Sequence, residues 1–322
     1  MPPESLYTLI ADDMKAVDAV VRVRLHSDVV LVRQVAEYIV AGGGKRMRPA
    51  LVVLVANALG YRGSHHHELA AVVEFIHTAT LLHDDVVDES SLRRGRETAN
   101  ALFGNAASVL VGDFLYSRAF QMMTAVGSMR VMEVLSEATN VIAEGEVLQL
   151  MNCNNPDITT EQYLQVIHYK TAKLFEAAAR LGAILANADA GIEQAMAEYG
   201  AHLGNAFQLV DDALDYSGDE AETGKRLGDD LAEGKTTLPL IHVMARGNAE
   251  QSKNVRTAIE SGGRELFSEV LAAIHATGAL EATLQAAAVE SAAAKEALAA
   301  LPASRYKDSL LEFADFAVAR AY

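Results

Sequence analysis

Two groups of aspartates in this chain have the spacing of a metal site. Asp84 and Asp88 end one long apolar, helix-like run, and Asp211 and Asp215 end another. Residues four apart share one face of a helix, so each pair can direct two carboxylates at one point. Carboxylates that close repel each other, and the helix dipole opposes negative charge at a helix C-terminus. Divalent cations would relieve both costs, so the two groups predict metal binding, with the helix ends facing each other across a cavity.

Basic residues follow the first of these groups. Arg93, Arg94 and Arg96 come shortly after Asp88. A guanidinium binds phosphate oxygens through paired hydrogen bonds, and Mg²⁺ binds carboxylate and phosphate oxygens. The combination indicates a metal-bridged phosphate site. One aspartate group alone would fit a solvated helix end better, and the second copy is what favours the metal.

The composition excludes several kinds of partner. The chain has 322 residues and a formal net charge of −16, which argues against nucleic acids and anionic lipids because both attract basic surfaces. The single cysteine, Cys153, cannot form an internal disulfide. No signal-peptide pattern opens the chain, and the longest apolar run, Leu51–Ala56, is too short to span a bilayer. We therefore predict a cytoplasmic protein without an integral membrane segment.

Apolar residues recur with a helical period along almost the whole chain, and no segment alternates convincingly as a strand. The expected helices are 5–25, 28–41, 49–59, 66–89, 106–125, 128–151, 159–187, 191–216 and 238–246, followed by alanine-rich helix to residue 322 with a break at Gly262–Gly263. Asp157 or Thr159 is expected to cap the helix 159–187. Residues 217–237 are polar and rich in glycine, as in a lid. No shift in composition divides the chain, so we predict one all-α domain over residues 1–322.

A run of three histidines, His65–His67, stands at the start of the helix expected over residues 66–89. Imidazoles are common metal ligands. Adjacent residues at a helix start do not face one another. The pattern therefore favours an exposed polar turn over a metal site.

Five motifs in the expected order resemble the trans-isoprenyl diphosphate synthases, and most of all their long-chain, octaprenyl-type members. They are GGGKRMRP at 42–49, HTATLLHDDVVDESSLRRGRETAN at 77–100, YKT at 169–171, FQLVDDALDY at 207–216 and GKRLGDDLAEGKTTLP at 224–239. The resemblance covers nearly the whole chain. It implies an all-α antiparallel helix bundle around a deep central cavity, a homodimer, and Mg²⁺ as cofactor with three ions in each active site.

The resemblance also implies roles for single residues. Asp84 and Asp88 would hold Mg²⁺ on an allylic diphosphate with support from Asp85, and Asp211 and Asp215 would hold a further ion. The residues expected to contact the allylic diphosphate are Arg93, Lys170, Thr171 and Gln208. The residues expected to be catalytic are Lys170 and the motif aspartates Asp84, Asp85, Asp88 and Asp211. The residues expected to bind isopentenyl diphosphate are Lys45, Arg48, His77 and Arg94. Lys225 and Lys235 match lysines near the lid.

The physical chemistry of the basic segment agrees with these roles. Gly42–Gly44 release the backbone into a turn, and Lys45, Arg46 and Arg48 follow it. Isopentenyl diphosphate must bind without losing its diphosphate, and a basic pocket that lacks carboxylates suits that requirement. His77 lies two helical turns before the first aspartate group, on the same face.

The implied reaction is the head-to-tail condensation of isopentenyl diphosphate onto an allylic diphosphate, with farnesyl diphosphate as the starter. Short-chain relatives carry bulky aromatics at the fifth and fourth positions before the first aspartate, whereas this chain has Ala79 and Thr80. The small residues imply a long product: octaprenyl first, then nonaprenyl or decaprenyl, for a quinone side chain such as that of ubiquinone. Gly200 and Gly204 either leave room for that product or permit close helix packing.

Four alternative functions fit the sequence less well. A geranylgeranyl or farnesyl diphosphate synthase shares the chemistry, but the small Ala79 and Thr80 disfavour the farnesyl product. A class I terpene cyclase normally replaces the second aspartate motif with a mixed one. A non-catalytic prenyl-synthase subunit would lose motif aspartates or the basic pocket, and both are intact. A purely structural scaffold fails on two unneutralised carboxylate clusters.

Overall fold

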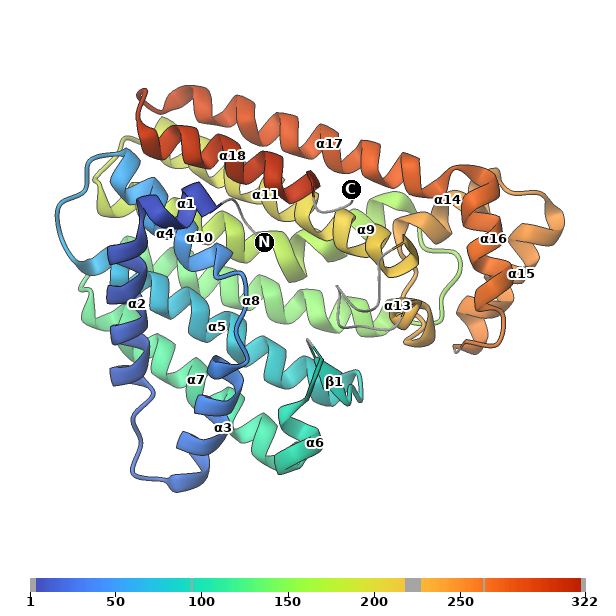
Figure 1. Ribbon diagram of the computed structural model, residues 1–322, viewed down its shortest axis with the longest axis horizontal. Coiled ribbons are helices and arrows are strands. Elements are labelled where there is room, and N and C mark those ends of the chain that lie inside the picture. The colour runs from blue at the N-terminus through green and yellow to red at the C-terminus, as the bar shows by residue number, and fades with distance from the viewer. Residues whose placement is uncertain (1–3, 94, 218–226, 263, 320–322) are drawn as a thin grey trace. The chain divides into compact units, whose positions relative to one another are not determined.

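The computed structural model describes residues 4–93, 95–217, 227–262 and 264–319, and these residues are mostly helical (Figure 1). The all-α prediction is confirmed. Two of the predicted binding residues, Arg94 and Lys225, lie outside the described residues. None of the described helices is long and apolar enough to cross a bilayer.

The helices up to residue 152 follow the predicted order. They are α1 Glu4–Leu9, α2 Ala11–Arg24, α3 Val30–Ala41, α4 Met47–Ala58, α5 His65–Val87, α6 Ala99–Phe103, α7 Asn105–Ala125 and α8 Met129–Asn152. A short antiparallel ribbon of β1 Leu92–Arg93 and β2 Arg96–Glu97 stands between α5 and α6. The expectation of no strand is therefore wrong at this point. Gly95, with a φ of +71°, allows the tight turn that joins the two strands.

The remaining helices are also close to those expected. They are α9 Thr160–Ile167, the π-helical turn η1 His168–Ala172, α10 Lys173–Leu185, α11 Ala190–Ser217, α13 Asp229–Ala232, α14 Leu238–Arg246, α15 Ala249–Ser261, α16 Phe267–Thr277, α17 Ala279–Ala297, the 3₁₀ turn η2 Leu298–Ala300 and α18 Arg305–Ala319. Of the two candidate caps for α9, Thr159 is the one used. Its side chain accepts from the amide of Gln162, whose side chain in turn accepts from the amide of Thr159.

The chain divides into two compact units, each made of separate segments. The first contains residues 1–139, 174–200 and 296–313, and the second contains 140–173, 201–295 and 314–322. The single domain over residues 1–322 stays a prediction. The first aspartate motif belongs to the first unit, and the second motif belongs to the second unit.

The first unit places the first aspartate motif at the end of a well-packed helix. Helix α5 packs against α2, α4 and α7. Helix α4 is buried and apolar from Ala50 to Ala56, as expected for a helix enclosed by others. Gly182 of α10 allows a close approach to α4, because a Cβ there would lie 2.7 Å from Cβ of Val55 and 2.8 Å from the amide nitrogen of Ala56. The aspartates of α5 thus stand on a rigid element.

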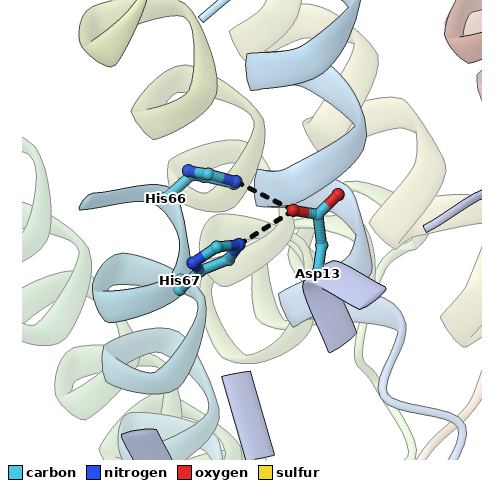
Figure 2. A group of neighbouring side chains, drawn as sticks. All are labelled: Asp13, His66 and His67. Atoms are coloured by element: carbon cyan, nitrogen blue, oxygen red, sulfur yellow. Dashed lines mark hydrogen bonds and ion pairs between the residues drawn. The ribbon is translucent and has the colours of Figure 1, made fainter. Parts of the chain in front are cut away.

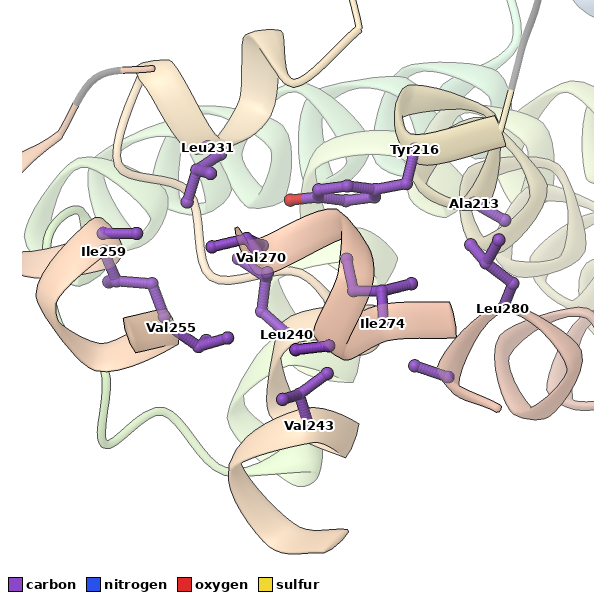
Figure 3. Close-up of a cluster of buried hydrophobic side chains, with 13 residues drawn as sticks. Ala213, Tyr216, Leu231, Leu240, Val243, Val255, Ile259, Val270, Ile274 and Leu280 are labelled. Atoms are coloured by element: carbon purple, nitrogen blue, oxygen red, sulfur yellow. The ribbon is translucent and has the colours of Figure 1, made fainter. Parts of the chain in front are cut away.

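The second unit places the second aspartate motif between two apolar clusters. In the first cluster, Ala213 and Tyr216 of α11 and Leu231 of α13 pack with side chains of α14, α15 and α16 (Figure 3). In the second, Leu209 and Val210 of α11 pack with side chains of α9. These clusters fix the rotation of α11 and therefore the direction of its aspartates.

Candidate active site

The first aspartate motif keeps helical geometry to its last residue. Asp84 and Asp85 lie in the last turn of α5, and Asp88 is its C-terminal cap, with its amide donating to the Asp84 carbonyl at 2.8 Å. Asp84 and Asp88 are half-buried, whereas Asp85 is fully buried. The outer two carboxylates are therefore the ones that a ligand from solvent can reach.

Asp85 holds Arg93 in place. Nε of Arg93 donates to Oδ1 of Asp85 at 2.8 Å, and a second guanidinium nitrogen lies 2.6 Å from the same oxygen. Burial raises the pKa of Asp85 although Arg93 opposes the shift. Burial disfavours the charge of Arg93, yet the hydrogen bond to Asp85 holds the pKa of Arg93 above its usual value. Asp85 is thus a positioning residue for the arginine.

The oxygen atoms at this helix end fit a hard divalent cation. Asp84 and Asp88 offer carboxylates, the donors that Mg²⁺ prefers. Oδ2 of Asp85 is buried and has no hydrogen-bond partner within the part of the chain that the structure describes. An acceptor left in this state is costly unless a cation or its bound water lies nearby.

A small pocket in the first unit, with a volume of about 40 Å³, brings His77 together with Asp85 and Arg93. Its wall also includes Glu74, whose carboxylate lies 3.1 Å from the guanidinium of Arg46. Neither Lys45 nor Arg48 lines this pocket, so the basic pocket expected from the sequence stays a prediction. Arg46 thus has an internal counter-charge in Glu74.

The other basic residues of the glycine-rich segment differ in burial. Lys45 is exposed, and its backbone carbonyl accepts a hydrogen bond from the hydroxyl of Tyr7. Arg48 is half-buried, with its guanidinium 4.3 Å from the ring centre of Phe175. An arginine stacked on an aromatic face keeps its hydrogen-bonding edge available in a fixed direction.

The second aspartate motif repeats the pattern of the first. Asp211 and Asp215 are half-buried, and Asp212 between them is only 3% exposed. The hydroxyl of Tyr163 donates to Oδ2 of Asp212 at 2.5 Å, and Nε2 of Gln208 donates to Oδ1 at 2.7 Å. Burial, with the charge of Asp230, raises the pKa of Asp212 to about 8. Asp212 is thus the centre of a buried network.

Two predicted diphosphate contacts belong to this network. Oγ1 of Thr171 donates to Oε1 of Gln208 at 2.8 Å, and Gln208 donates in turn to Asp212. The sequence did not indicate this connection, because Tyr163 and Asp212 lie far apart in the chain and no local pattern links them. The network holds α11 and η1 in a fixed register.

Lys170 lies in the π-helical turn η1. Its Nζ donates to Oε2 of Glu146 and to Oε1 of Gln149, both at 2.6 Å and both on α8. Helix α8 packs closely against η1 because Gly145 has no side chain. A Cβ at Gly145 would lie 2.9 Å from the amide nitrogen of Lys170. Single π-helical turns are frequent at functional sites, where they redirect one side chain.

The described part of the predicted lid is attached to the second motif. The carboxylate of Asp215 accepts from the amides of Asp229 at 3.2 Å and Asp230 at 3.3 Å. Arg264 forms an ion pair with Asp229. Lys235 pairs with Glu233 at 2.5 Å. Asp215 therefore anchors α13, and its role as a metal ligand stays a prediction.

The predicted chain-length residues lie one to two turns before Asp84. Ala79 is fully buried, and Thr80 is half-buried, with its hydroxyl donating to the His77 carbonyl at 2.8 Å. At Gly200, an added Cβ would lie 2.4 Å from the carbonyl oxygen of Phe175. Gly200 therefore serves close packing of α11 on α10, the second of the two roles considered for it.

Comparisons with known proteins give one consistent result. Residues 29–276 match the family described as Polyprenyl synthetase. The chain is 57% identical over 318 residues to the octaprenyl diphosphate synthase of Escherichia coli strain K12, covering 98% of each chain. It is 45% identical to the all-trans-nonaprenyl-diphosphate synthase (geranyl-diphosphate specific) of Rhodobacter capsulatus, covering 97% of this chain and 96% of that one. A crystal structure of polyprenyl synthase from Caulobacter crescentus CB15, complexed with calcium and isoprenyl diphosphate, gives a TM-score of 0.95 at 46% identity, covering 99% of this chain and 98% of that one.

Proposed function

This chain belongs to the polyprenyl synthetase family, and we propose that it is an octaprenyl diphosphate synthase. It is a prenyltransferase that condenses isopentenyl diphosphate head to tail onto an allylic diphosphate and makes a long trans-polyprenyl chain. The observation that carries the octaprenyl product is the 57% identity to the Escherichia coli enzyme over nearly all of both chains. Farnesyl diphosphate is the proposed starter.

The relative from Rhodobacter capsulatus supports a second candidate for both the starter and the product. It is a nonaprenyl synthase described as specific for geranyl diphosphate. Its identity of 45% is lower than the 57% of the octaprenyl relative. The nonaprenyl product and the geranyl starter therefore rank second, and a destination in a quinone side chain such as that of ubiquinone fits either product.

The family depends on divalent metal ions, and we propose that Mg²⁺ fills this role with three ions per active site. Asp84 and Asp88 would hold it on the allylic diphosphate, and Asp211, with Asp215, would hold a further ion. Bound Mg²⁺ would neutralise the charge of the leaving diphosphate. Carboxylates at two helix C-termini supply the negative charge that such a site needs.

The protein's own cations would stabilise the same charge as it develops. When the C–O bond of the allylic diphosphate breaks, the electron pair goes to the diphosphate. Arg93, held by Asp85, and Lys170, held by Glu146 and Gln149, are fixed before the reaction. Preorganised charges of this kind stabilise a transition state without reorganisation.

The second substrate would bind to the basic residues without ionising. We assign isopentenyl diphosphate to Lys45, Arg48, His77 and Arg94, with Lys225 and Lys235 acting at the lid. Its double bond attacks the allylic carbocation, and a proton then leaves the new chain. Arg48 stacked on Phe175 supports this assignment, because the aromatic ring holds the guanidinium in a fixed position.

We propose that the protein acts as a homodimer. Val147, Leu150 and Met151 of α8 are 58%, 61% and 75% exposed. Several large apolar side chains exposed on one helix are typical of a surface that another protein chain covers. The cytoplasmic location stays a prediction from the sequence.

An assay of diphosphate release tests the reaction and its metal dependence. Wild-type protein with farnesyl diphosphate, isopentenyl diphosphate and Mg²⁺ should release diphosphate, and chelation of the metal should abolish the release. Asp84→Asn should lower kcat by roughly 100-fold or more, the usual loss for one preorganised electrostatic group. Asp12→Asn, at a fully exposed carboxylate, is the control and should retain activity. Release that persists in the chelator would contradict the proposal.

A further inference from the structure

Asp13, His66 and His67 form a cluster that none of the family motifs contains (Figure 2). Asp13 lies on α2, and the two histidines lie in the first turn of α5. Nε2 of His66 is 3.2 Å and Nε2 of His67 is 2.8 Å from the same oxygen, Oδ1 of Asp13. The exposed polar turn expected from the sequence is therefore wrong, since His66 is only 5% exposed and both rings turn towards α2.

Neighbouring side chains fix the three groups in this arrangement. Nδ2 of Asn57 donates to Oδ2 of Asp13 at 2.9 Å, which leaves Oδ1 directed at the imidazoles. Tyr61 packs edge-on against the ring of His66, with ring centres 5.4 Å apart. The rings of His66 and His67 lie 3.9 Å apart. A site whose donors are held by other residues loses little freedom when it binds an ion.

The three side chains also influence one another. Burial and the neighbouring His67 lower the pKa of His66. Burial alone would raise the pKa of Asp13, but hydrogen bonds from His67, His66 and Asn57 lower it below its usual value. The cluster thus presents two imidazole nitrogens within hydrogen-bond distance of one carboxylate oxygen.

We propose that Asp13, His66 and His67 bind a divalent first-row transition metal ion, with Zn²⁺ as the first candidate. Metal–nitrogen and metal–oxygen bonds of about 2.0–2.2 Å place neighbouring donor atoms about 2.8–3.1 Å apart when the bonds meet at right angles and about 3.3–3.6 Å apart in a tetrahedral site. The observed separations of 2.8 and 3.2 Å are close to these ranges. Each ring would bind the ion through Nε2, the atom that faces Asp13. Imidazole donors select such ions over Mg²⁺, which prefers oxygen.

The partial exposure of the cluster allows water to act as a further ligand, and its position between α2 and α5 determines what a bound ion would stabilise. The side chains of Asp13 and His67 are 27% and 21% exposed, so water can complete the coordination from that side. An ion held here would join α2 to the start of α5, the helix that carries the first aspartate motif at its other end. This effect on stability does not depend on the proposed catalytic function.

The test is a titration of the untagged full-length protein with Co²⁺, in excess Mg²⁺ that occupies the carboxylate sites. Wild-type protein should bind one Co²⁺ per chain, with the visible absorption of a histidine-ligated ion, and Zn²⁺ should displace it. His67→Ala should weaken binding by about 100-fold or more, since even a group that only supports a ligand is worth 10- to 100-fold. His65→Ala, at the exposed neighbouring histidine, should bind as wild type.

Thermal unfolding provides a second readout on the same proteins. Zn²⁺ should raise the Tm of wild type and His65→Ala but not that of His67→Ala, because binding to the folded state alone stabilises it. His67 is the residue to replace because it is partly exposed, and circular dichroism checks that the variant is folded. No binding by the wild type, or equal binding and an equal Tm shift in His67→Ala, would overturn the proposal and leave a hydrogen-bonded tie between the helices.

Discussion

Asp85 and Asp212 are the middle residues of the two aspartate motifs, and both are buried while their neighbours are half-exposed. Helical spacing alone predicts that the middle residue points away from the outer two. What the spacing does not reveal is the partner, which is Arg93 for Asp85 and Tyr163 for Asp212. Each middle carboxylate is used to position another group, a role that depends on tertiary contacts.

Replacing Asp85 by asparagine should both weaken the binding of the allylic diphosphate and slow the chemical step, because Arg93 is expected to contact the diphosphate before and during the reaction. The variant keeps the side-chain shape but removes the negative charge that holds Arg93. Hydrogen bonds to charged groups contribute about 1.5–3 kcal/mol, so we expect the KM for the allylic diphosphate to rise about 10- to 100-fold. Steady-state kinetics separate KM from kcat. Asp113→Asn, at a carboxylate 62% exposed, is the matched control, and equal KM values in both variants would argue against the positioning role.

Most helices could be predicted from the sequence because their apolar periodicity is long. The bounds of α7, α8, α11 and α14 agree with the expected ranges to within about two residues, the usual uncertainty at helix ends. Elements that depend on distant contacts could not be predicted. The π-helical turn η1 interrupts the helix expected over 159–187, at the place where Gly145 of α8 packs against it.

Short elements could not be predicted from the sequence for a different reason. The strands Leu92–Arg93 and Arg96–Glu97 have two residues each, too few for an alternating pattern to be visible. The burial of His66 likewise depends on α2, which is far away in sequence. For the candidate site, the sequence predicts which acidic and basic residues take part and which helix face carries the aspartates. It does not predict the ion pairs that hold Arg46, Arg93 and Lys170.

Gly200 gives a prediction about the packing of one helix on another. A Cβ at this position would meet the backbone of Phe175 and Glu176 at 2.4 and 2.7 Å, so Gly200→Ala should destabilise the protein by about 1–3 kcal/mol through overpacking. Gly191→Ala, near the exposed start of the same helix, would meet only the Asp189 carboxylate, at 3.2 Å, and should be close to neutral, because that side chain can shift and alanine is the better helix former. Urea unfolding measures both, and a neutral Gly200→Ala would show that α10 and α11 are not closely packed there.

Ala79 gives a prediction about the product that α5 permits. If the growing chain passes this position, the series Ala79→Val, Ala79→Leu and Ala79→Phe should shorten the product step by step. A change in stability alone would lower the yield of all products without shifting their distribution. Chromatography of the products therefore separates the two effects, and an unchanged distribution across the series would exclude Ala79 from the product tunnel.

For the whole molecule, the sequence and the comparisons lead to the same chemistry. With a formal net charge of −16, the protein would bind diphosphates through metal ions held by the motif aspartates and through a few fixed cations. The similarity to long-chain synthases extends over nearly the entire chain. This similarity predicts a long product, and a product assay measures its length directly.

The most direct test is therefore the product distribution of the purified wild-type protein with farnesyl diphosphate, labelled isopentenyl diphosphate and Mg²⁺. We predict a ladder of intermediates that ends at octaprenyl diphosphate. A ladder that ends at geranylgeranyl diphosphate would contradict the long-chain product and the role given to Ala79 and Thr80. Folded protein with no product at all would contradict the catalytic assignment itself.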